Sequence, residues 1–234
     1  FTPTAIERLR PQVQQLVDDV LDRAADRGSM ELVDELAFPV PFEVISILLD
    51  LPTDRSDEIR DWSQALTAAL EPTVDEAGLA AADQAAIGLG AYMREVVADR
   101  RKHLGDDLLS GLIQAEEAVD RLSEVEMISF VLLLYVAGHE TTVNLIGNGM
   151  LALLRHPDEL RRWRDDPSLD TKAVDELLRY DGPVPQTVRV PLVDVTYGDV
   201  TVPAQSLVMT VLGSASHDPA VFDDPETLRL DRPN

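Results

Sequence analysis

Hydrophobic residues recur every three to four positions through most of the first 182 residues, a spacing that places them on one face of an α-helix. Glycine and proline interrupt the pattern at intervals and divide it into separate segments. We therefore expect a series of helices over residues 5–27 with Thr4 as the N-cap, 30–49 with an interruption at Pro39 and Pro41, 54–70, 75–102, 107–116, 158–165 and 171–180.

The longest helical pattern lies in the middle of the chain. Ser123 and Glu126 have the spacing of a capping box, in which each side chain accepts a hydrogen bond from the other residue's backbone N–H. No proline follows before Pro157, so we expect one helix of about 32 residues, roughly 48 Å long. Apolar residues occupy nearly every face around 130–137, which predicts that this part of the helix is buried on all sides.

The pattern changes after Gly182-Pro183. Short segments rich in β-branched residues alternate with glycine and proline, which is typical of strands and tight turns. We expect a mainly α-helical fold in a single domain of residues 1–234, with a helical part at 1–182 and a strand and coil part at 183–234. The expected strands are 186–191, 195–197, 200–202 and 207–212, followed by coil from residue 217.

Composition narrows the class of protein. Hydrophobic residues make up 45% of the chain, enough for a sizeable core, and the net charge is −23. Such an acidic chain is not expected to bind nucleic acid or an anionic membrane surface. The richest apolar run, 127–137, has 11 residues, too few to cross a bilayer. With no signal peptide pattern at the start of the sequence, we expect a soluble cytoplasmic protein.

The chain contains no cysteine. It therefore has no disulfide framework, no thiolate metal ligand and no cysteine nucleophile. Histidine does not replace it, because none of the four histidines has another four residues away, so no zinc site is expected. His139-Glu140 begins like a zinc protease motif, but Val143 stands where the second histidine would be.

The central helix carries the hexapeptide Ala137-Gly138-His139-Glu140-Thr141-Thr142. An acid followed by an alcohol is suited to handling protons beside bound dioxygen. Apolar runs on both sides predict that Glu140 is buried, and a buried glutamate requires partners or a raised pKa. Gly138 costs about 1 kcal/mol of helix stability relative to alanine, a cost that is tolerated where another group must approach the backbone.

A second candidate is the pair Glu176 and Arg179, which share one face of a helix. The Glu-x-x-Arg spacing occurs four times, and taken alone it favours an exposed pair worth about 0.2–0.5 kcal/mol. The pair at 176–179 is the one that lies among apolar neighbours and just before the change from helix to strand. If buried, it would be rigid and bidentate.

Two acidic motifs leave an alternative open. Asp18, Asp19 and Asp22 form a D-D-x-x-D pattern that could hold Mg²⁺ against a diphosphate, as in class I terpene synthases. The run 106–110 is similar to the second metal motif of those enzymes, although Gln114 replaces its last acid. Gly147 to Ala152 matches a dinucleotide-binding pattern, but it follows a helix, so close helix packing is the better interpretation.

Taken in order, these runs resemble cytochrome P450, in particular the soluble bacterial class. The hexapeptide 137–142 is similar to the middle of the family's long I helix, and the run 174–184 is similar to its K helix. The resemblance extends over all 234 residues and also rests on Phe1-Thr2-Pro3, 105–110, 122–124, Arg189 and 216–222.

The resemblance implies a P450 fold and a haem-thiolate monooxygenase with haem b. Such an enzyme inserts one oxygen atom of O₂ into a small organic substrate, with electrons from NAD(P)H through a ferredoxin-type donor. Glu140 would relay protons, and Thr141 would hydrogen-bond dioxygen at the iron or its water. The resemblance also implies a haem-facing groove at Ala137 and Gly138.

Further roles follow from the same resemblance. Arg189 would pair with a haem propionate, and Glu176 with Arg179 would form a structural pair. The side chains expected to line the substrate pocket are Val184, Pro185, Thr187 and Val188.

Two departures from the family pattern are visible. The third partner of the Glu–Arg pair belongs to a P-E-R-F-like segment, but residues 225–228 read Pro-Glu-Thr-Leu, so we expect an incomplete triad that Arg229 does not complete. The family's cysteine iron ligand is absent, so we expect a piece of a longer P450, inactive alone and lacking its N-terminal part and cysteine loop. The alternatives are a haem-free P450-like scaffold that recruits another protein, or a terpene synthase.

Overall fold

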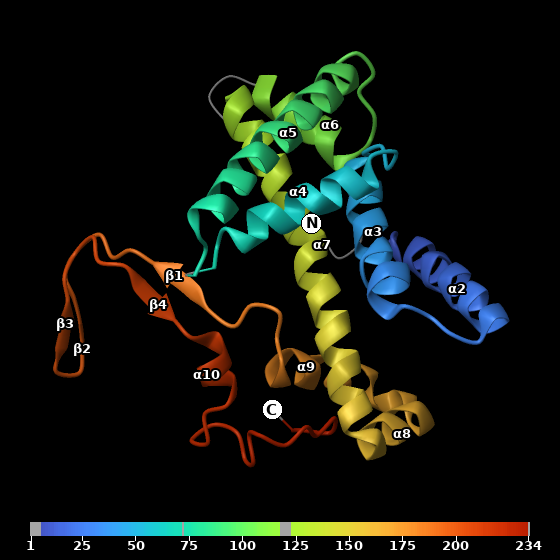
Figure 1. The fold of residues 1–234 in the computed structure, drawn as a ribbon, viewed down its shortest axis with the longest axis vertical. Coiled ribbons are helices and arrows are strands. Elements are labelled where there is room, and N and C mark those ends of the chain that lie inside the picture. Colours follow the sequence, from blue (N-terminus) through green and yellow to red (C-terminus); the bar gives the residue numbers. More distant parts are fainter. Residues whose placement is uncertain (1–5, 72, 118–122, 234) are drawn as a thin grey trace. The chain divides into compact units, whose positions relative to one another are not determined.

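A computed structural model describes residues 6–71, 73–117 and 123–233, and the helical start expected at Thr4 lies outside them. The chain separates into two compact units, Phe1–Val143 and Asn144–Asn234. The long helix α7 (Glu124–Arg155) contains the boundary between them. Figure 1 labels the elements of both units.

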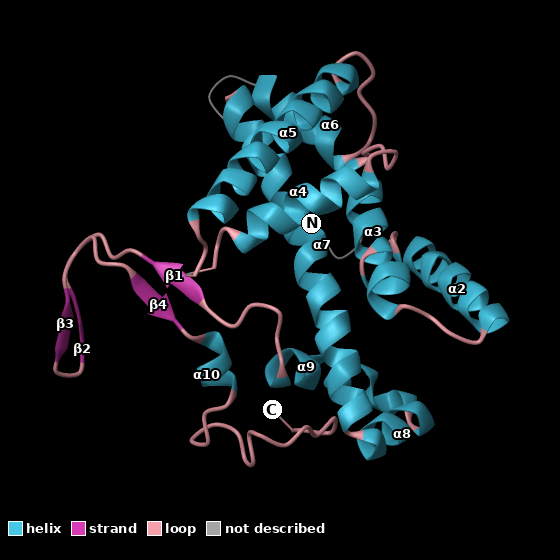
Figure 2. Ribbon diagram, in the orientation of Figure 1, coloured by secondary structure: helices cyan, strands magenta, loops and turns pink. Residues whose placement is uncertain are grey.

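The first unit is helical throughout (Figure 2). Its elements correspond closely to the expected segments, and Gly28 ends the first with a left-handed φ of 74°. The expected interruption of the segment at 30–49 is confirmed: η1 ends at Ala37, and a new helix begins at Pro39 with both prolines in its first turn, where proline is tolerated. The elements are α2 (Arg10–Arg27), the π-helix η1 (Val33–Ala37), α3 (Pro39–Leu49), α4 (Ser56–Ala68), α5 (Glu76–Arg100), α6 (Leu108–Glu117) and the first part of α7.

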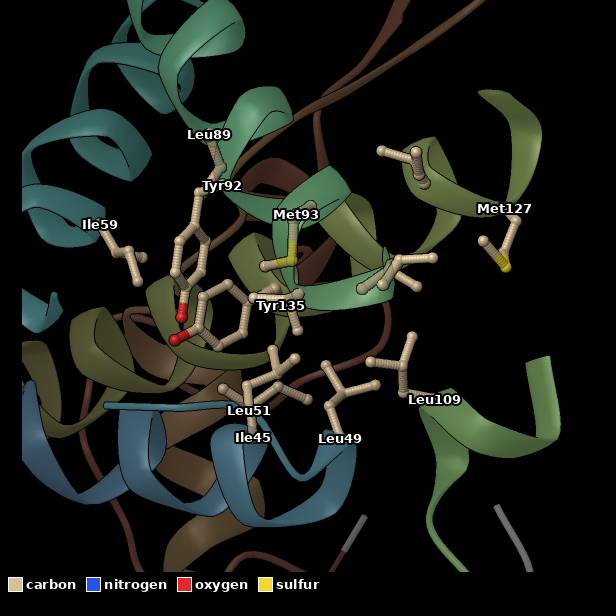
Figure 3. Close-up of a cluster of buried hydrophobic side chains, with 14 of the residues drawn as sticks. Ile45, Leu49, Leu51, Ile59, Leu89, Tyr92, Met93, Leu109, Met127 and Tyr135 are labelled. Atoms are coloured by element: carbon tan, nitrogen blue, oxygen red, sulfur yellow. The ribbon is translucent and has the colours of Figure 1, made fainter. Parts of the chain in front are cut away.

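The core of this unit joins side chains from α3, α4, α5, α6 and α7 (Figure 3). Leu89 and Met93 of α5 are fully buried in it, and so is Tyr135 of α7. The hydroxyl groups of Tyr135 and Ser46 lie 3.2 Å apart, which satisfies the polar end of the tyrosine inside an apolar cluster. These contacts fix the part of α7 that carries the hexapeptide.

Helix α7 begins as the capping box predicts. The Ser123 N–H donates to Glu126 Oε2 at 2.8 Å, and the Glu126 N–H donates to Ser123 Oγ at 3.3 Å. The helix has 32 residues, as expected. By length and composition α7 is also apolar enough to cross a membrane, a test that core helices pass as well.

The prediction that residues 130–137 are buried on all sides is wrong. Val131 and Tyr135 are fully buried, but Leu133 is 63% exposed. A run of apolar residues shows that every face of the helix is apolar, yet it does not determine which faces have a neighbour. Ala137 lies on one of the exposed faces.

The second unit contains the rest of α7, further helices and two small sheets. Its core joins Ala152 and Leu153 of α7 to Ala173, Leu177 and the tail residues Leu228 and Leu230. A Cβ at Gly149 would lie 3.3 Å from Leu177 Cδ1, so the glycine-rich run allows close helix packing, as predicted. The helices are α8 (Pro157–Asp165), the 3₁₀-helix η2 (Pro167–Leu169), α9 (Asp170–Tyr180) and α10 (Leu212–Ser216).

The strands fall where the β-branched segments predicted them. β1 (Thr187–Arg189) pairs antiparallel with β4 (Val208–Thr210), with Thr187 opposite Thr210. β2 (Val195–Tyr197) and β3 (Val200–Val202) form a hairpin with Gly198 at a left-handed φ of 57°. The helix α10 was not expected, because its five residues fall inside a segment read as strand and turn.

Candidate functional site

The acid and the alcohol of the hexapeptide occupy different environments on α7. The side chain of Glu140 is only 14% exposed, which confirms the predicted burial. Burial raises the pKa of Glu140, while the positive charge of Arg60 acts in the opposite direction. Thr141 is half-buried, and its hydroxyl group donates to the carbonyl of Ala137 at 2.9 Å. The threonine oxygen therefore keeps its lone pairs for a second partner.

Gly138 gives α3 close access to α7. A Cβ at this position would lie 2.8 Å from Cδ1 of Ile45 and 2.9 Å from its Cγ1. The expected approach of another group to the backbone is therefore observed, and the approaching group is a side chain of α3.

His139 is fully buried between the acid and the core. Its Nδ1 lies 2.7 Å from the Tyr135 carbonyl oxygen, and its Nε2 has no hydrogen-bond partner among the described residues. Phe38, Phe42 and Tyr135 pack around the ring with centroid distances of 5.7–5.8 Å. The sequence pattern indicated this histidine only as a zinc ligand, because Phe38 and Phe42 lie about 100 residues earlier in the chain.

Arg60 is a second residue that the sequence did not indicate. It projects from α4, places its guanidinium 4.6 Å from the centroid of the Phe38 ring, and pairs with Asp34 at 2.6 Å. Since its charge also acts on Glu140, it links that carboxylate to the aromatic cluster around His139. Arg60 and Phe38 lie 80 or more residues before Glu140 in the sequence, so no local spacing indicates that they are close to it.

A large apolar cavity of about 840 Å³ also lies in the first unit. Side chains of α2, α3 and α7 line it, and Ala137 and Gly138 form part of its wall. Its charged members, Glu7 and Arg10, pair with each other at 2.8 Å and are exposed. Neither Glu140 nor Thr141 contributes to its lining. The cavity therefore lacks groups suited to chemistry despite its size.

In the second unit, Glu176 and Arg179 form the buried, bidentate pair that their apolar neighbours suggested. Arg179 Nε and Nη2 donate to the two carboxylate oxygens at 2.7 and 2.9 Å, and the residues are 3% and 9% exposed. The Glu7–Arg10 pair, by contrast, is exposed. Arg179 also donates to the carbonyls of Ser216 and Pro225, so it ties α9 to the tail.

The expected incomplete triad is wrong, because Arg232 completes it. Its Nε donates to Glu176 Oε2 at 3.0 Å, and the residue is 5% exposed. Further bonds join its guanidinium to the carbonyls of Asp223, Asp224 and Thr227. Thr227 thus contributes its backbone oxygen in place of a charged side chain. Arg232 lies beyond the P-E-R-F-like segment at 225–228, so the family pattern did not indicate it.

The electrostatics of this triad favour an ionised glutamate. Burial alone would raise the pKa of Glu176, but hydrogen bonds from Arg179, the Arg229 N–H and Arg232 together hold the pKa below its usual value. The Arg229 N–H donates to Oε1 at 2.9 Å. Arg229 therefore does reach the glutamate, through its backbone and not its side chain.

The remaining predicted site residues lie at the start of the strand region. Arg189 is exposed on β1 and donates to the Thr187 hydroxyl group at 2.7 Å and to the Val188 carbonyl at 2.8 Å. No carboxylate pairs with it in the described part of the chain. Val184 and Pro185 help to line a cavity of about 500 Å³, whereas Thr187 and Val188 do not.

The acidic motifs do not form a metal site in the described residues. Asp18 and Asp19 accept hydrogen bonds from Gln14 and Gln15 on an exposed face of α2. Asp107 is engaged by Arg100 and by the hydroxyl group and N–H of Ser110. Within the ranges that the structure covers, no group of three acidic or histidine residues is placed to hold a metal ion.

Comparison with known proteins places this geometry in a family. The cytochrome P450 family model matches residues 168–234, the stretch that holds the buried triad. Cytochrome P450 107B1 of Saccharopolyspora erythraea is 45% identical to this chain, in an alignment that covers 99% of this chain. The biotin biosynthesis cytochrome P450 of Bacillus subtilis is 34% identical over the same share.

The solved structures decide the fold. P450BioI, crystallised with an acyl carrier protein carrying hexadec-9Z-enoic acid, superposes on the whole chain with a TM-score of 0.94 at 33% identity. CYP109E1 from Bacillus megaterium, in complex with testosterone, gives 0.93 at 30% identity. The chain has the cytochrome P450 fold, and its sequence is similar to those of bacterial cytochromes P450. It spans 56% and 58% of the length of the two curated relatives and 60% of the P450BioI chain.

The P450 fold explains several features at once. It accounts for the long central helix and for the run 106–110, and it leaves the terpene synthase alternative without support. Proteins of this family bind haem, so haem is the cofactor that the fold implies.

Proposed function

We propose that the complete protein containing this chain is a haem-thiolate monooxygenase that inserts one oxygen atom of O₂ into a small organic substrate. The observation that carries the proposal is the pair Glu140 and Thr141 on α7, in a chain that superposes on P450 structures. The names of two relatives, vitamin D(3) 25-hydroxylase and 6-deoxyerythronolide B hydroxylase, support hydroxylation as the reaction.

The residues present fit a haem on two separate counts. The exposed face of α7 at Ala137 and Thr141 offers a small side chain and a hydroxyl oxygen to a flat ligand. In the second unit, the guanidinium of Arg189 has no carboxylate partner among the described residues and would pair with a propionate. The iron ligand is not among these 234 residues, since they contain no cysteine.

A bound haem supplies the activation of dioxygen and the oxygen transfer, and the protein supplies protons and positioning. Glu140, with its raised pKa, retains its proton to higher pH than an exposed glutamate and delivers it along α7. Thr141 accepts a hydrogen bond at Oγ1 while donating to Ala137, so it orients a proton donor beside it.

The other residues position the reactants. In this proposal the bound substrate lies beside Val184, Pro185, Thr187 and Val188. Electrons come from NAD(P)H through a ferredoxin-type partner, and the protein is soluble and cytoplasmic like the bacterial class it resembles. Glu176, Arg179 and Arg232 hold the second unit together and take no part in the chemistry.

The test compares two adjacent threonines in the complete, haem-loaded protein. Thr141→Ala removes the hydroxyl group from the half-buried position, and Thr142→Ala removes it from an exposed position one residue away. Because positioned proton transfer contributes about 10²–10⁴-fold to such steps, product formed per NAD(P)H consumed should fall about tenfold or more in Thr141→Ala. NAD(P)H consumption should continue with release of peroxide, and Thr142→Ala should behave like the wild type. Unchanged coupling in Thr141→Ala would contradict the role of Thr141.

A further inference from the structure

The protonation of His139 follows from its contacts. Nδ1 lies 2.7 Å from the carbonyl oxygen of Tyr135, and a carbonyl oxygen can only accept, so Nδ1 carries the ring proton. Burial lowers the pKa of His139, so a second proton on the ring is disfavoured. Nε2 is therefore an unprotonated acceptor, directed into the protein interior.

This acceptor is buried without a partner. Nε2 makes no hydrogen bond with any described residue, and the histidine is 0% exposed. The rings of Phe38, Phe42 and Tyr135 hold the imidazole from three sides and offer no polar hydrogen to Nε2. An unpaired polar atom in the interior is destabilising, and its presence in a native protein calls for an explanation.

The carboxyl group of Glu140 explains why Nε2 of His139 has no other partner. Oε1 of Glu140 lies 3.7 Å from Nε2, beyond hydrogen-bond length but within reach of a small rotation of the glutamate side chain. We propose that Nε2 of His139 is the acceptor for the protonated carboxyl group of Glu140, and that His139 thereby orients the proton carrier. This role makes His139 a positioning residue, and its effect on catalysis rests on the proposed function.

The surrounding charges act in opposite directions on the same carboxyl group. Arg60 of α4 favours the ionised form of Glu140, although the guanidinium of Arg60 also forms an ion pair with Asp34 of η1. His139 of α7 favours the protonated form, because a neutral imidazole accepts from a carboxylic acid but repels a carboxylate. On α3, the charge of Glu43 acts on Tyr135, which packs against the His139 ring.

Titration of the Glu140 carboxyl group in the complete haem-loaded protein tests the proposal without turnover. The protonated carboxyl band is followed by infrared difference spectroscopy against pH and is assigned by its loss in Glu140→Gln. His139→Phe keeps an aromatic ring and removes both nitrogens, so the midpoint should move to lower pH. His139→Gln restores one donor and one acceptor and should move the midpoint back toward the wild-type value.

His156, the residue between α7 and α8, provides the control. Its Nδ1 lies 2.8 Å from the Ala152 carbonyl, the same bond to the residue four positions earlier. His156→Phe should leave the Glu140 midpoint unchanged. If His139→Phe does not fold, ¹⁵N-histidine spectra of the wild type serve instead: the Nε2 resonance of His139 should shift through the Glu140 titration, and should not shift in Glu140→Gln.

An unchanged midpoint in folded His139→Phe, or a midpoint moved to higher pH, would overturn the proposal, and so would an Nε2 resonance insensitive to Glu140. The histidine would then serve packing alone. The titration tests the role of His139, and the coupling assay of Thr141→Ala tests the proposed function, so a negative result in one does not decide the other. Loss of oxygenase activity leaves the titration result standing, while an unmoved midpoint beside an uncoupled Thr141→Ala rejects only the role of His139.

Discussion

At the scale of single residues, buried guanidinium groups satisfy several acceptors at once. Arg232 donates to the Glu176 carboxylate and to three backbone carbonyls, although it is 5% exposed. Such a group cannot be removed without leaving buried oxygen atoms unpaired. It stabilises the fold through these carbonyls as well as through the ion pair.

We expect Arg232→Ala to lower the free energy of unfolding by about 3 kcal/mol, because breaking a buried ion pair leaves its partner uncompensated. Arg162→Ala is the control, since Arg162 pairs with Asp231 at 2.7 Å on the surface. That exposed pair should be worth about 0–1 kcal/mol. Urea denaturation of the complete protein measures the free energy of unfolding of both variants. Equal losses would show that the buried triad stabilises the protein no more than the exposed pair does.

What the sequence revealed at this scale depends on distance along the chain. Glu140 and Thr141 are adjacent, and Glu176 and Arg179 are one helical turn apart, so local patterns identified both pairs. Arg232 reaches Glu176 across 56 residues, and no periodicity connects them. The same holds for Arg60 and for the contacts of the His139 ring with Phe38 and Phe42, which come from other parts of the chain.

At the scale of elements, the packing of α3 on α7 depends on Gly138. Gly138→Ala would place a Cβ 2.8 Å from Cδ1 of Ile45. We expect a net loss of stability of about 1 kcal/mol, because overpacking costs about 1–3 kcal/mol and alanine returns about 1 kcal/mol of helix propensity. Ile45→Ala should relieve the contact, so Gly138→Ala should be neutral or stabilising in that background.

Gly147 on the same helix is the matched control for this prediction. A Cβ at Gly147 would meet nothing within 4 Å. Gly147→Ala should therefore raise the free energy of unfolding by up to about 1 kcal/mol through helix propensity alone. Thermal denaturation of the two variants distinguishes the cases, and two equal responses would mean that the contact with Ile45 does not matter.

The elements themselves were largely predictable, for physical reasons. Ser123 and Glu126 determine the start of α7 through local hydrogen bonds, and β2 and β3 match the expected ranges because Gly198 allows the turn between them. Burial around 130–137 was predicted wrongly, since the apolar character of a face does not specify what packs on it. The short helix α10 has too few residues for a periodic pattern.

At the scale of the whole molecule, two glutamates give opposite dependences of stability on pH. The pKa of Glu176 is lowered in the folded state, so its contribution is present above the unfolded pKa and is lost as pH falls through the folded pKa. The pKa of Glu140 is raised, so stability declines as pH rises from the unfolded pKa to the folded one.

We therefore expect Glu176→Gln to destabilise the protein at neutral pH and to flatten the loss of stability in acid. Glu140→Gln should do the reverse at neutral pH, where it removes the cost of ionising a buried carboxyl group. Free energies of unfolding measured from neutral to acidic pH compare the two variants with the wild type. If both variants changed the free energy of unfolding in the same direction at neutral pH, the opposite effects assigned to Glu176 and Glu140 would be contradicted.

The most direct test of the proposed haem-thiolate enzyme is the absorption spectrum of the complete protein, expressed from its full reading frame, reduced and treated with carbon monoxide. A haem held by a thiolate has a strongly red-shifted Soret band under these conditions, and the proposed function predicts that band. No haem absorption, or a Soret band without the shift, would contradict a haem-thiolate enzyme. The first result would favour a haem-free scaffold with the same fold.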